Sequence, residues 1–576
     1  LFYLVPQMVG AGVLIEPLLG ISHFWGVIIV GSAVILIVAV GGMTSTTYVQ
    51  FFNGGLLLLF AAILTGAVLV RGISVNQSYF EEGERDLGSY QFREISAELQ
   101  DGNLSVDLPG AQVLRSHVEV DPNTSEETLV LYQISYLVPV DESGEIITVN
   151  IKGRTLQVNT AGSDVSDYEF EEFEGETYLR IQDWWRLSSD EESAVTLVET
   201  QFRAVHPDGR VMVNGLPESS DNRMRQVGGV SQIPERFGTS TGALGPLRLL
   251  GVISDPDTIV QQPKNTAFSN EEGVQVNVYY EEPIKGSLFM RPGLLFPLEA
   301  KPGEPPGTTL LNRLNFISLM LALFLGTAAL PHILIRYFTV PDPDSARKST
   351  IIAIISIGLF YIFTMYLGVG AINSGGLNPE TSNMSAPLLA RSFGEVLFAM
   401  ISGIAFTTVL ATVSGLIMAA SGAVAHDLMG SIRRRKFSDD TKVRVGRLVS
   451  IVVGSIGIVL GIIFREMNVS FLVGWAFAVA ASANLPSLVM MLFWKKTTAQ
   501  GIISSILVGI FASVSLIMLS PDMWVRYGLD PANAPMPINQ PGIVSIPLSF
   551  IVLVVVSLLT AKGETEPDTV GSHLNG

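Results

Sequence analysis

The sequence predicts a polytopic membrane protein, all-helical in its membrane part, with a mostly β insert on the extracytoplasmic side. Three observations lead to this fold class. Only 15% of the 576 residues are charged, whereas a soluble protein carries roughly a quarter. Several segments are apolar over the roughly 20 residues that a spanning helix needs. Residues 72–311 hold 39 acidic and 17 basic side chains, so an acidic, water-facing insert separates two groups of apolar segments.

Composition excludes other classes of protein. Intrinsic disorder requires low hydrophobicity, but 48% of the residues are hydrophobic. A secreted disulfide scaffold requires cysteine, and the sequence contains none. The net charge of −18 is unfavourable for a nucleic-acid partner, although it comes from the insert and the rest of the chain is slightly basic. We therefore expect membrane lipid as a partner, and no nucleic acid.

The chain begins at Leu1, inside an apolar run, without the basic start or the small-residue cleavage site of a signal peptide. We expect an N-terminally truncated sequence. Membrane helices are predicted over 1–71 and 312–563, an extracytoplasmic domain over 72–311 and a cytoplasmic tail over 564–576. The predicted spans are the segments 1–20, 23–41, 48–70, 314–335, 350–371, 394–424, 443–464, 469–493, 500–519 and 543–561.

Lys and Arg in short loops predict the orientation of these spans, because such residues stay in the cytoplasm. The loops after the fourth, sixth and eighth spans are basic, and alternation places all three on one side. Their basic residues are Arg336, Arg347, Lys348, Arg433–Arg435, Lys436, Lys442, Arg444, Arg447, Lys495 and Lys496. The insert then falls outside the cell, and the C-terminal tail lies inside.

The insert has the pattern of a β domain. Segments 128–140, 146–158 and 177–182 are rich in β-branched and aromatic residues, and turn-forming clusters at 121–123 and 141–144 separate them. With about 240 residues it is large enough to bury a core of its own. It contains no His/Cys metal cluster, nucleophile elbow or phosphate loop, so its partner is not readable from a motif.

The fourth span contains the strongest helix-breaking signal. Gly326 weakens the helix, and Pro331 lacks a backbone donor and clashes with the preceding turn. Interrupted helices at membrane depth survive only where they line a cavity or lie within protein, so carbonyl groups near residues 326–328 could bind a ligand. A kinked helix without a ligand is the alternative. His332 follows near the predicted cytoplasmic end, where a structural role is at least as reasonable as proton transfer.

The sixth span carries small and hydroxylated residues at helical spacing. Thr408, Thr412 and Gly415 follow one another, with Ala411 beside them. Hydroxyl groups four residues apart and a loosened backbone carbonyl could supply oxygen ligands to a hard cation such as Na⁺. The alternative is close helix packing, which small-residue stripes commonly serve. Glu16 in the first span is either an interfacial anchor or a site residue. Asn484, Leu485 and Pro486 in the eighth span form another polar break and a plausible cavity wall.

Five stretches resemble the sodium/solute symporter family, and especially its cation/acetate symporter branch. They are QMVGAG at 7–12, GGMTSTTYVQ at 41–50, GTAALPHILIRYFTV at 326–340, AHDL at 425–428 and AFAVAASANLP at 476–486. The resemblance covers nearly all of the apolar part in the family's order. The proline-histidine string and the two-glycine turn are its most specific elements.

The resemblance implies an inverted-repeat core of five plus five helices. Residues 1–71 would be core helices 3–5, and 312–563 would be core helices 6–10 with two further helices, while the first two core helices are absent. The implied activity is Na⁺-coupled (or H⁺-coupled) symport of a small monocarboxylate such as acetate across the plasma membrane of a prokaryote. Such transport breaks no covalent bond, so we expect neither enzymatic residues nor a cofactor, only Na⁺ as coupling ion.

The resemblance also implies site residues. Thr408, through its carbonyl group, Ala411 and Thr412 would bind the cation, although Ala411 lacks the hydroxyl that some members carry there. Phe324, Gly326 and Thr327, together with Asn484, would line the substrate site. No metal site is expected beyond that of the transported cation.

Two other interpretations remain open at this point. The solute could be an amino acid or a sugar, or the chain could be a sensor whose insert binds a ligand. A sensor needs a cytoplasmic output module, for which the roughly 15 residues after the last span are too short. The insert could also be a docking or shielding domain on a transporter, and deletion of residues 76–305 would then spare uptake.

Overall fold

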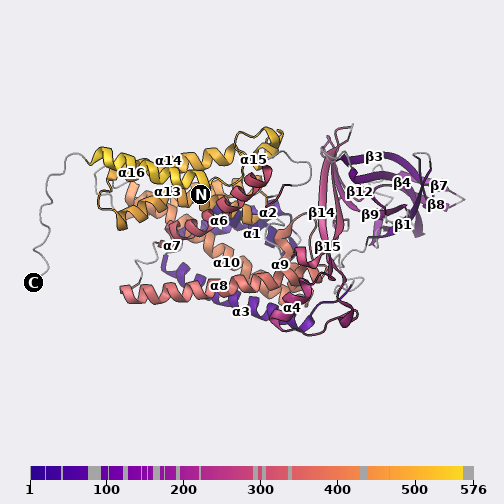
Figure 1. Cartoon of the computed structure of the whole chain (residues 1–576), viewed down its shortest axis with the longest axis horizontal. Coiled ribbons are helices and arrows are strands. Elements are labelled where there is room, and N and C mark those ends of the chain that lie inside the picture. Colours follow the sequence, from indigo (N-terminus) through magenta and orange to yellow (C-terminus); the bar gives the residue numbers. More distant parts are fainter. Residues whose placement is uncertain are drawn as a thin grey trace, which may run out of the picture.

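The structure is a computed structural model of the 576-residue chain. It describes residues 2–19, 21–40, 43–75, 92–100, 103–120, 127–143, 146–151, 154–159, 169–173, 176–189, 195–219, 222–270, 272–289, 296, 298–300, 307–334, 340–428, 439–465 and 467–561. Helices lie at one end of the molecule and most of the strands at the other, with the hairpin of β14 and β15 between them (Figure 1).

The long helices coincide with all ten segments that the sequence predicts as spans. They are α1 (Leu4–Leu19), α2 (His23–Val40), α3 (Met43–Arg71), α6 (Thr308–Ala329), α8 (Pro343–Asn373), α10 (Glu395–Gly422), α12 (Asp439–Ile463), α13 (Val469–Phe493), α14 (Ala499–Met518) and α16 (Gly542–Thr560). Among the described residues, eight of these helices are long and apolar enough to cross a membrane, and 4–15 and 23–39 form shorter apolar helices. The chain is a mostly helical, multi-pass membrane protein with a β-rich region.

Two groups of helices share most of the packing in the helical part. α10 contacts α1, α2, α3 and α12, while α13 contacts α6, α14 and α16. Glycine permits the closest crossings. A Cβ atom at Gly326 of α6 would lie 2.5 Å from Phe477 Cβ of α13, and one at Gly509 of α14 would lie 2.2 Å from the Ser482 carbonyl oxygen. These two glycines therefore set the distances of α6 and α14 from α13.

Short helices complete this part of the chain. The 3₁₀-helix η4 (Ser382–Met384) and α9 (Ser385–Arg391) connect α8 to α10, and α15 (Pro521–Arg526) and η6 (Pro531–Asn533) connect α14 to α16. α10 continues into the π-helix η5 (Ala423–Leu428). The predicted polar break at Asn484 and Pro486 does not interrupt the chain's helical course, because α13 runs through Pro486 to Phe493.

The β-rich region consists of two antiparallel sheets. In the described residues the first sheet has nine strands in the order β2-β1-β9-β8-β4-β5-β6, with β3 on β4 and β7 on β8. Its strands are β1 (Glu94–Gln100), β2 (Asn103–Val106), β3 (Gln112–Val120), β4 (Glu127–Ser143), β5 (Ile146–Ile151), β6 (Arg154–Asn159), β7 (Glu169–Phe173), β8 (Glu176–Ser189) and β9 (Val195–Glu199). The predicted strand segments are confirmed, except that 146–158 forms two paired strands, β5 and β6.

The second sheet has six strands in the order β12-β11-β10-β15-β14-β13 over the described part of the chain. They are β10 (Gln201–Val205), β11 (Val211–Val213), β12 (Leu216–Pro217), β13 (Gly229–Gln232), β14 (Ile259–Ser269) and β15 (Gln275–Lys285), with η2 (Glu235–Phe237), α4 (Pro246–Ile253) and α5 (Gly286–Phe289) beside them. Buried apolar residues join the two sheets, among them Leu131 and Trp184 of the first and Phe202 and Val276 of the second.

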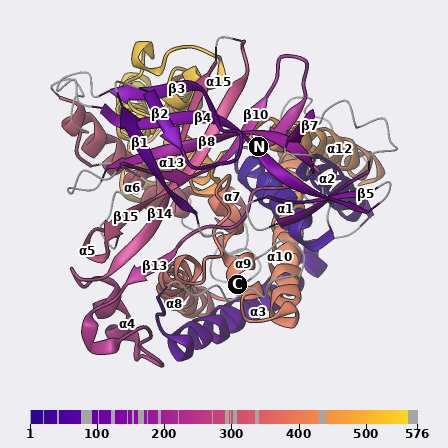
Figure 2. The ribbon, with the colours of Figure 1, turned by 90° about the vertical axis from the view of Figure 1, so that its right-hand side faces the viewer.

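The second sheet is joined to the helices by a shared hydrophobic core. Leu64 and Val68 of α3 and Val369 of α8 belong to one buried cluster with Leu249 of α4 and Val260 of β14. Burial of this apolar surface from water stabilises the junction. Figure 2, seen from the strand end, shows β13 and β14 in front of the helices, with α4 near α8 and α3.

Hydrogen bonds reinforce the same junction. At the end of α8, the Asn373 Nδ2 atom donates to the Gly72 carbonyl oxygen over 2.9 Å, and the Ser74 backbone N–H donates to Asn373 Oδ1 over 3.3 Å. Beyond α8, Val227 and Leu377 exchange two backbone hydrogen bonds of 2.8 and 3.1 Å. The insert and the connector between α8 and α10 therefore form one continuous structure.

Several sequence predictions fall outside the described residues. They concern the two-glycine turn at Gly41 and Gly42, the basic residues Arg336 and 433–436, and the tail 564–576. Glu16, His332 and Asp427 lie in described helices, α1, α7 and η5 respectively, but their side chains belong to the undescribed part.

Candidate functional site

The predicted break in the fourth span is present at Leu330. α6 ends at Ala329, Leu330 is extended, and the short helix α7 (Pro331–Leu334) begins at the proline. The last carbonyl groups of a helix lack intrahelical partners, and here the amide Nδ2 of Asn484 in α13 donates to the Ala329 oxygen over 3.0 Å. The helix thus ends directly after the predicted carbonyl groups of residues 326–328, and Asn484 satisfies the one at Ala329.

The predicted substrate-lining residues of α6 point in different directions. Gly326 is buried against Phe477, whereas the Phe324 side chain is 79% exposed. Thr327 is exposed, and its hydroxyl donates to the Leu323 carbonyl oxygen over 2.7 Å. Within the described part of the chain, Gly326 and Asn484 thus belong to the α6–α13 contact, and Phe324 and Thr327 lie on a different, uncovered face of α6.

The predicted cation-binding residues lie together on α10. The Thr408 hydroxyl donates to the Ile404 carbonyl oxygen over 2.7 Å, and the Thr412 hydroxyl donates to the Thr408 oxygen over 2.9 Å. Each hydroxyl oxygen keeps its lone pairs, whereas the two carbonyl oxygens also accept backbone N–H groups within α10. Two half-buried hydroxyl groups one turn apart therefore present oxygen ligands on one side of the helix.

A polar residue of α3 meets α10 at the same turn. Gln50 Nε2 donates to the Ala411 carbonyl oxygen over 2.6 Å. Asn53 follows three residues later on α3 and is 7% exposed, and its Nδ2 atom finds no hydrogen-bond partner among the described residues. Sequence analysis did not select Gln50 or Asn53, although two carboxamides in an apolar span are costly in lipid and mark functional positions.

An apolar cavity of about 310 Å³ lies beside this turn, between α1, α3, α8 and α10. Gly10, Phe60, Phe360 and Val409 line it from the four helices. Its described lining includes no charged side chain, and Thr364 and Asn383 are its polar members. Since Val409 is flanked by Thr408 and followed by Thr412, the cavity reaches the level of the predicted cation residues.

The α6 break and the α10 cluster are connected through α7, which contacts α10. At α10 the structure brings two threonine hydroxyls and the Gln50 carboxamide together, and Val409 between the threonines lines the apolar cavity. Hydroxyl and carbonyl oxygens suit a hard monovalent cation, and an apolar cavity of this size suits a small organic solute. Among the described residues, no group of three or more His, Asp or Glu could hold a transition metal.

Comparison with known proteins agrees with this arrangement. The model of the sodium:solute symporter family matches residues 1–85 and 296–509, which is more than half of the chain. The chain belongs to the sodium:solute symporter family. The matched residues include α1, α3, α6, α10 and α13. They therefore include all the predicted cation-binding and substrate-lining residues.

Two curated proteins are similar to part of this chain. A monocarboxylic acid transporter of Corynebacterium glutamicum is 47% identical over 264 residues, 44% of this chain and 47% of the relative. The protein named uncharacterized symporter YwcA of Bacillus subtilis is 41% identical over 278 residues, 46% of this chain and 53% of the relative. The chain spans about half the length of the curated relatives that it matches.

Proposed function

We propose that the full-length protein is a secondary active transporter that couples Na⁺, or alternatively H⁺, to the uptake of a small monocarboxylate such as acetate. The observation that carries the proposal is the end of α6 at Ala329, directly after the predicted solute residues Gly326 and Thr327 and in contact with the predicted Asn484 of α13. Transporters commonly bind solute and ion at such interruptions. Membership of a symporter family and a relative named as a monocarboxylic acid transporter support the class of solute.

The cation site in this proposal consists of the Thr408 carbonyl group, Ala411 and Thr412. Thr408 O and Ala411 O accept side-chain hydrogen bonds from Thr412 and Gln50 in addition to the backbone bonds of α10, so a cation at the Thr408 carbonyl group would take the place of the Thr412 hydroxyl proton donor. Gln50 holds the Ala411 carbonyl group toward α3, so it is a positioning residue of the same site. Phe324, Gly326, Thr327 and Asn484 form the substrate side.

The proposal includes an inverted-repeat core, with 1–71 as core helices 3–5 and the helices after residue 312 as core helices 6–10 and two more. It places the insert outside the cell and the C-terminus in the cytoplasm. Arg347 and Lys348 support this orientation, since they begin α8, whose other end at Asn373 meets the insert. Lys495 and Lys496 follow α13 and precede α14. Thr498, at that end of α14, contacts Thr560 at the C-terminal end of α16.

A transport assay tests the proposal. Protein expressed from its complete gene and reconstituted in vesicles should accumulate labelled acetate when an inward Na⁺ gradient is imposed, and should accumulate little with K⁺ in its place. Uptake driven by a proton gradient alone would assign H⁺ as the coupling ion. Acetate flux indifferent to both gradients would overturn coupled symport, and gradient-driven flux of other solutes without acetate would overturn the monocarboxylate assignment.

A further inference from the structure

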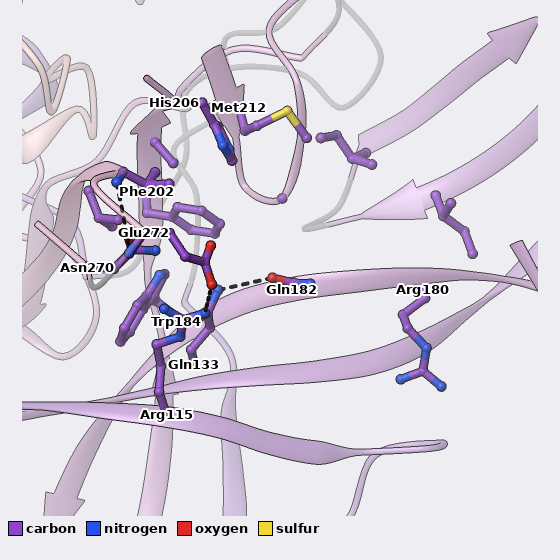
Figure 3. Close-up of a pocket in the computed structure, with 16 residues that line it drawn as sticks. Arg115, Gln133, Arg180, Gln182, Trp184, Phe202, His206, Met212, Asn270 and Glu272 are labelled. Atoms are coloured by element: carbon purple, nitrogen blue, oxygen red, sulfur yellow. Dashed lines mark hydrogen bonds and ion pairs between the residues drawn. The ribbon is translucent and has the colours of Figure 1, made fainter. Parts of the chain in front are cut away.

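The β-rich insert contains a cavity of its own, far from the proposed transport site. It has a volume of about 200 Å³ and lies where β4 and β8 of the first sheet face β10 and β15 of the second (Figure 3). Sites for drug-sized molecules are larger, about 300–1,000 Å³. The cavity therefore suits a smaller organic molecule.

One wall of this insert cavity is apolar and rigid. Trp184 is 2% exposed and Phe202 is 4% exposed, and both belong to the core that joins the sheets. The Trp184 ring packs edge-on against Phe268 with centroids 5.0 Å apart, which fixes its position. Met212, whose flexible side chain also lines the cavity, can adapt to ligands of different shape. This wall is suited to an apolar side chain.

Next to Trp184, at the paired position of β4, lies a buried hydrogen-bond acceptor without a partner among the described residues. Gln133 of β4 is 9% exposed, and its Nε2 atom donates to Gln182 Oε1 over 3.2 Å. Its Oε1 atom is buried and has no hydrogen-bond partner among the described residues. Buried polar atoms in folded proteins are normally paired, so a ligand that donates a hydrogen bond to Gln133 Oε1 would remove an unfavourable feature of the empty cavity.

Opposite charges lie side by side at the mouth of the cavity. Arg115 Nη2 of β3 is 3.1 Å from Glu272 Oε1 in the β14–β15 hairpin, and the side chains are 32% and 67% exposed. Asn270 Oδ1 accepts hydrogen bonds from the backbone N–H groups of Glu272 and Val274, which fixes the hairpin that carries the carboxylate. The second lining arginine, Arg180, points away from this pair in Figure 3 and is bonded to Glu171 and Ser135.

We propose that this cavity binds the zwitterion of a free α-amino acid with an apolar side chain. The carboxylate would pair with Arg115, the ammonium group would donate to Gln133 Oε1 and Glu272, and the side chain would contact Trp184 and Phe202. The two charges of the zwitterion would replace the Arg115–Glu272 ion pair. A simple carboxylate has no donor for Gln133 and would place a like charge beside Glu272, while an amine that took Glu272 from Arg115 would offer Arg115 no new acceptor. Only a ligand with adjacent charges of both signs satisfies all three groups.

Binding measurements on the full chain in nanodiscs test this proposal, which does not depend on the identity of the transported solute. Isothermal titration with each of the twenty standard L-amino acids should detect binding of at least one apolar amino acid, for which L-leucine is the reference probe. Two matched compounds each lack one charge of L-leucine: 4-methylpentanoate and 3-methylbutylamine. Both should bind at least about ten-fold more weakly than L-leucine, as expected for loss of a charge-assisted hydrogen bond.

Two variants locate the site. Arg115→Gln and Gln133→Leu should each weaken amino-acid binding about ten-fold or more. Arg210→Gln is the matched control, because Arg210 forms an exposed ion pair with Asp208 in the same insert and does not line the cavity; this variant should bind as the parent does. No binding of any amino acid, equal binding of 4-methylpentanoate, or equal weakening in the Arg210 variant would overturn the proposal.

Discussion

Asn484 and Ala329, 155 residues apart in the sequence, are joined by a hydrogen bond of 3.0 Å from the Asn484 amide to the Ala329 carbonyl oxygen. This bond lies at the end of α6, where Leu330 is extended and Pro331 begins the next helix. It converts a helix end that would otherwise leave a buried carbonyl group unpaired into a stable structure. α13 thus supports the interruption that the proposed solute site requires.

Asn484→Ala should lower the rate of solute uptake about ten-fold, because an unpaired buried acceptor costs about 1–3 kcal/mol and the α6 break would rearrange. The measurement is the initial rate of Na⁺-driven acetate uptake at equal amounts of reconstituted protein. Asn533→Ala is the control, since Asn533 lies in η6 and bonds to Asp530 in an exposed connector. Wild-type uptake by the Asn484 variant would contradict a role of this bond in transport.

Thr412→Val should raise the Na⁺ concentration for half-maximal uptake several-fold, because it removes one proposed oxygen ligand and keeps nearly the same volume. The neighbouring Thr407→Val is a close control. Thr407 lies on the same helix. Its hydroxyl donates to the Ile404 carbonyl oxygen, as the hydroxyl of Thr408 does, but Thr407 is exposed. Equal shifts in the two variants would indicate a general effect on α10 and would argue against cation binding at Thr412.

Gly326→Val should destabilise the helical part. Its Cβ atom would lie 2.5 Å from Phe477 Cβ and 2.6 Å from the Phe477 carbonyl oxygen, so α6 and α13 would have to separate. Overpacking of this kind costs typically about 1–3 kcal/mol, and the midpoint of thermal unfolding in detergent should fall. Gly358→Val provides the control, because a Cβ atom in that position of α8 meets nothing within 4 Å. A midpoint that falls no further for Gly326 than for Gly358 would contradict the close crossing.

The helices were predictable because a bilayer imposes a long apolar run on each span, and all ten segments coincide with helices. The break near Pro331 was also predictable, since proline removes a backbone donor. The group that satisfies its carbonyl end was not, because Asn484 belongs to another helix, 155 residues further along the sequence. Pro486 was expected to interrupt α13 for the same local reason, but neighbouring helices can satisfy the backbone around a proline, and α13 continues.

Contacts between distant segments account for what sequence analysis missed. Gln50 reaches the Ala411 carbonyl oxygen across 361 positions of sequence, and no local pattern links them. The insert was correctly predicted as mostly β. Its packing against the membrane helices was not predicted. Leu249 and Val260 look like ordinary core residues of a β domain, whereas the structure packs them against Val68 and Val369 of the helices.

Asn373→Ala should loosen the junction between the insert and the helices. Asn373 is 3% exposed and holds both the Gly72 carbonyl group and the Ser74 N–H group. Loss of both bonds should speed hydrogen exchange at the neighbouring Val75 and Thr241 amides by about ten-fold or more. Asn222→Ala, which removes buried bonds inside the second sheet instead, should leave those two amides protected. Unchanged exchange at Val75 and Thr241 in the Asn373 variant would show that the apolar cluster holds the junction without this residue.

The same junction should depend on pH through Glu281 of β15. Burial raises the pKa of Glu281 from its usual value to about 7, although a hydrogen bond from the Gly228 N–H group opposes the shift. Gly228 follows Val227, which pairs with Leu377 of the helical part. Because the folded state holds this proton more tightly than the unfolded state, the contribution of Glu281 to stability is complete below the ordinary glutamate pKa of 4.5 and is lost as the pH rises through about 7.

Glu281→Gln should therefore reduce the loss of thermal stability between pH 5 and pH 8, since the amide stays neutral and can still accept from Gly228. Glu199, whose pKa burial raises to about 8, titrates with the same sign and remains in the variant, so the slope should decrease without disappearing. Glu282→Gln, at the adjacent position where Glu282 pairs with Lys264 at the surface, should keep the parental slope. Melting midpoints of the three proteins in nanodiscs across this pH range make the comparison, and identical slopes for Glu281→Gln and the parent would mean that Glu281 is ionised throughout.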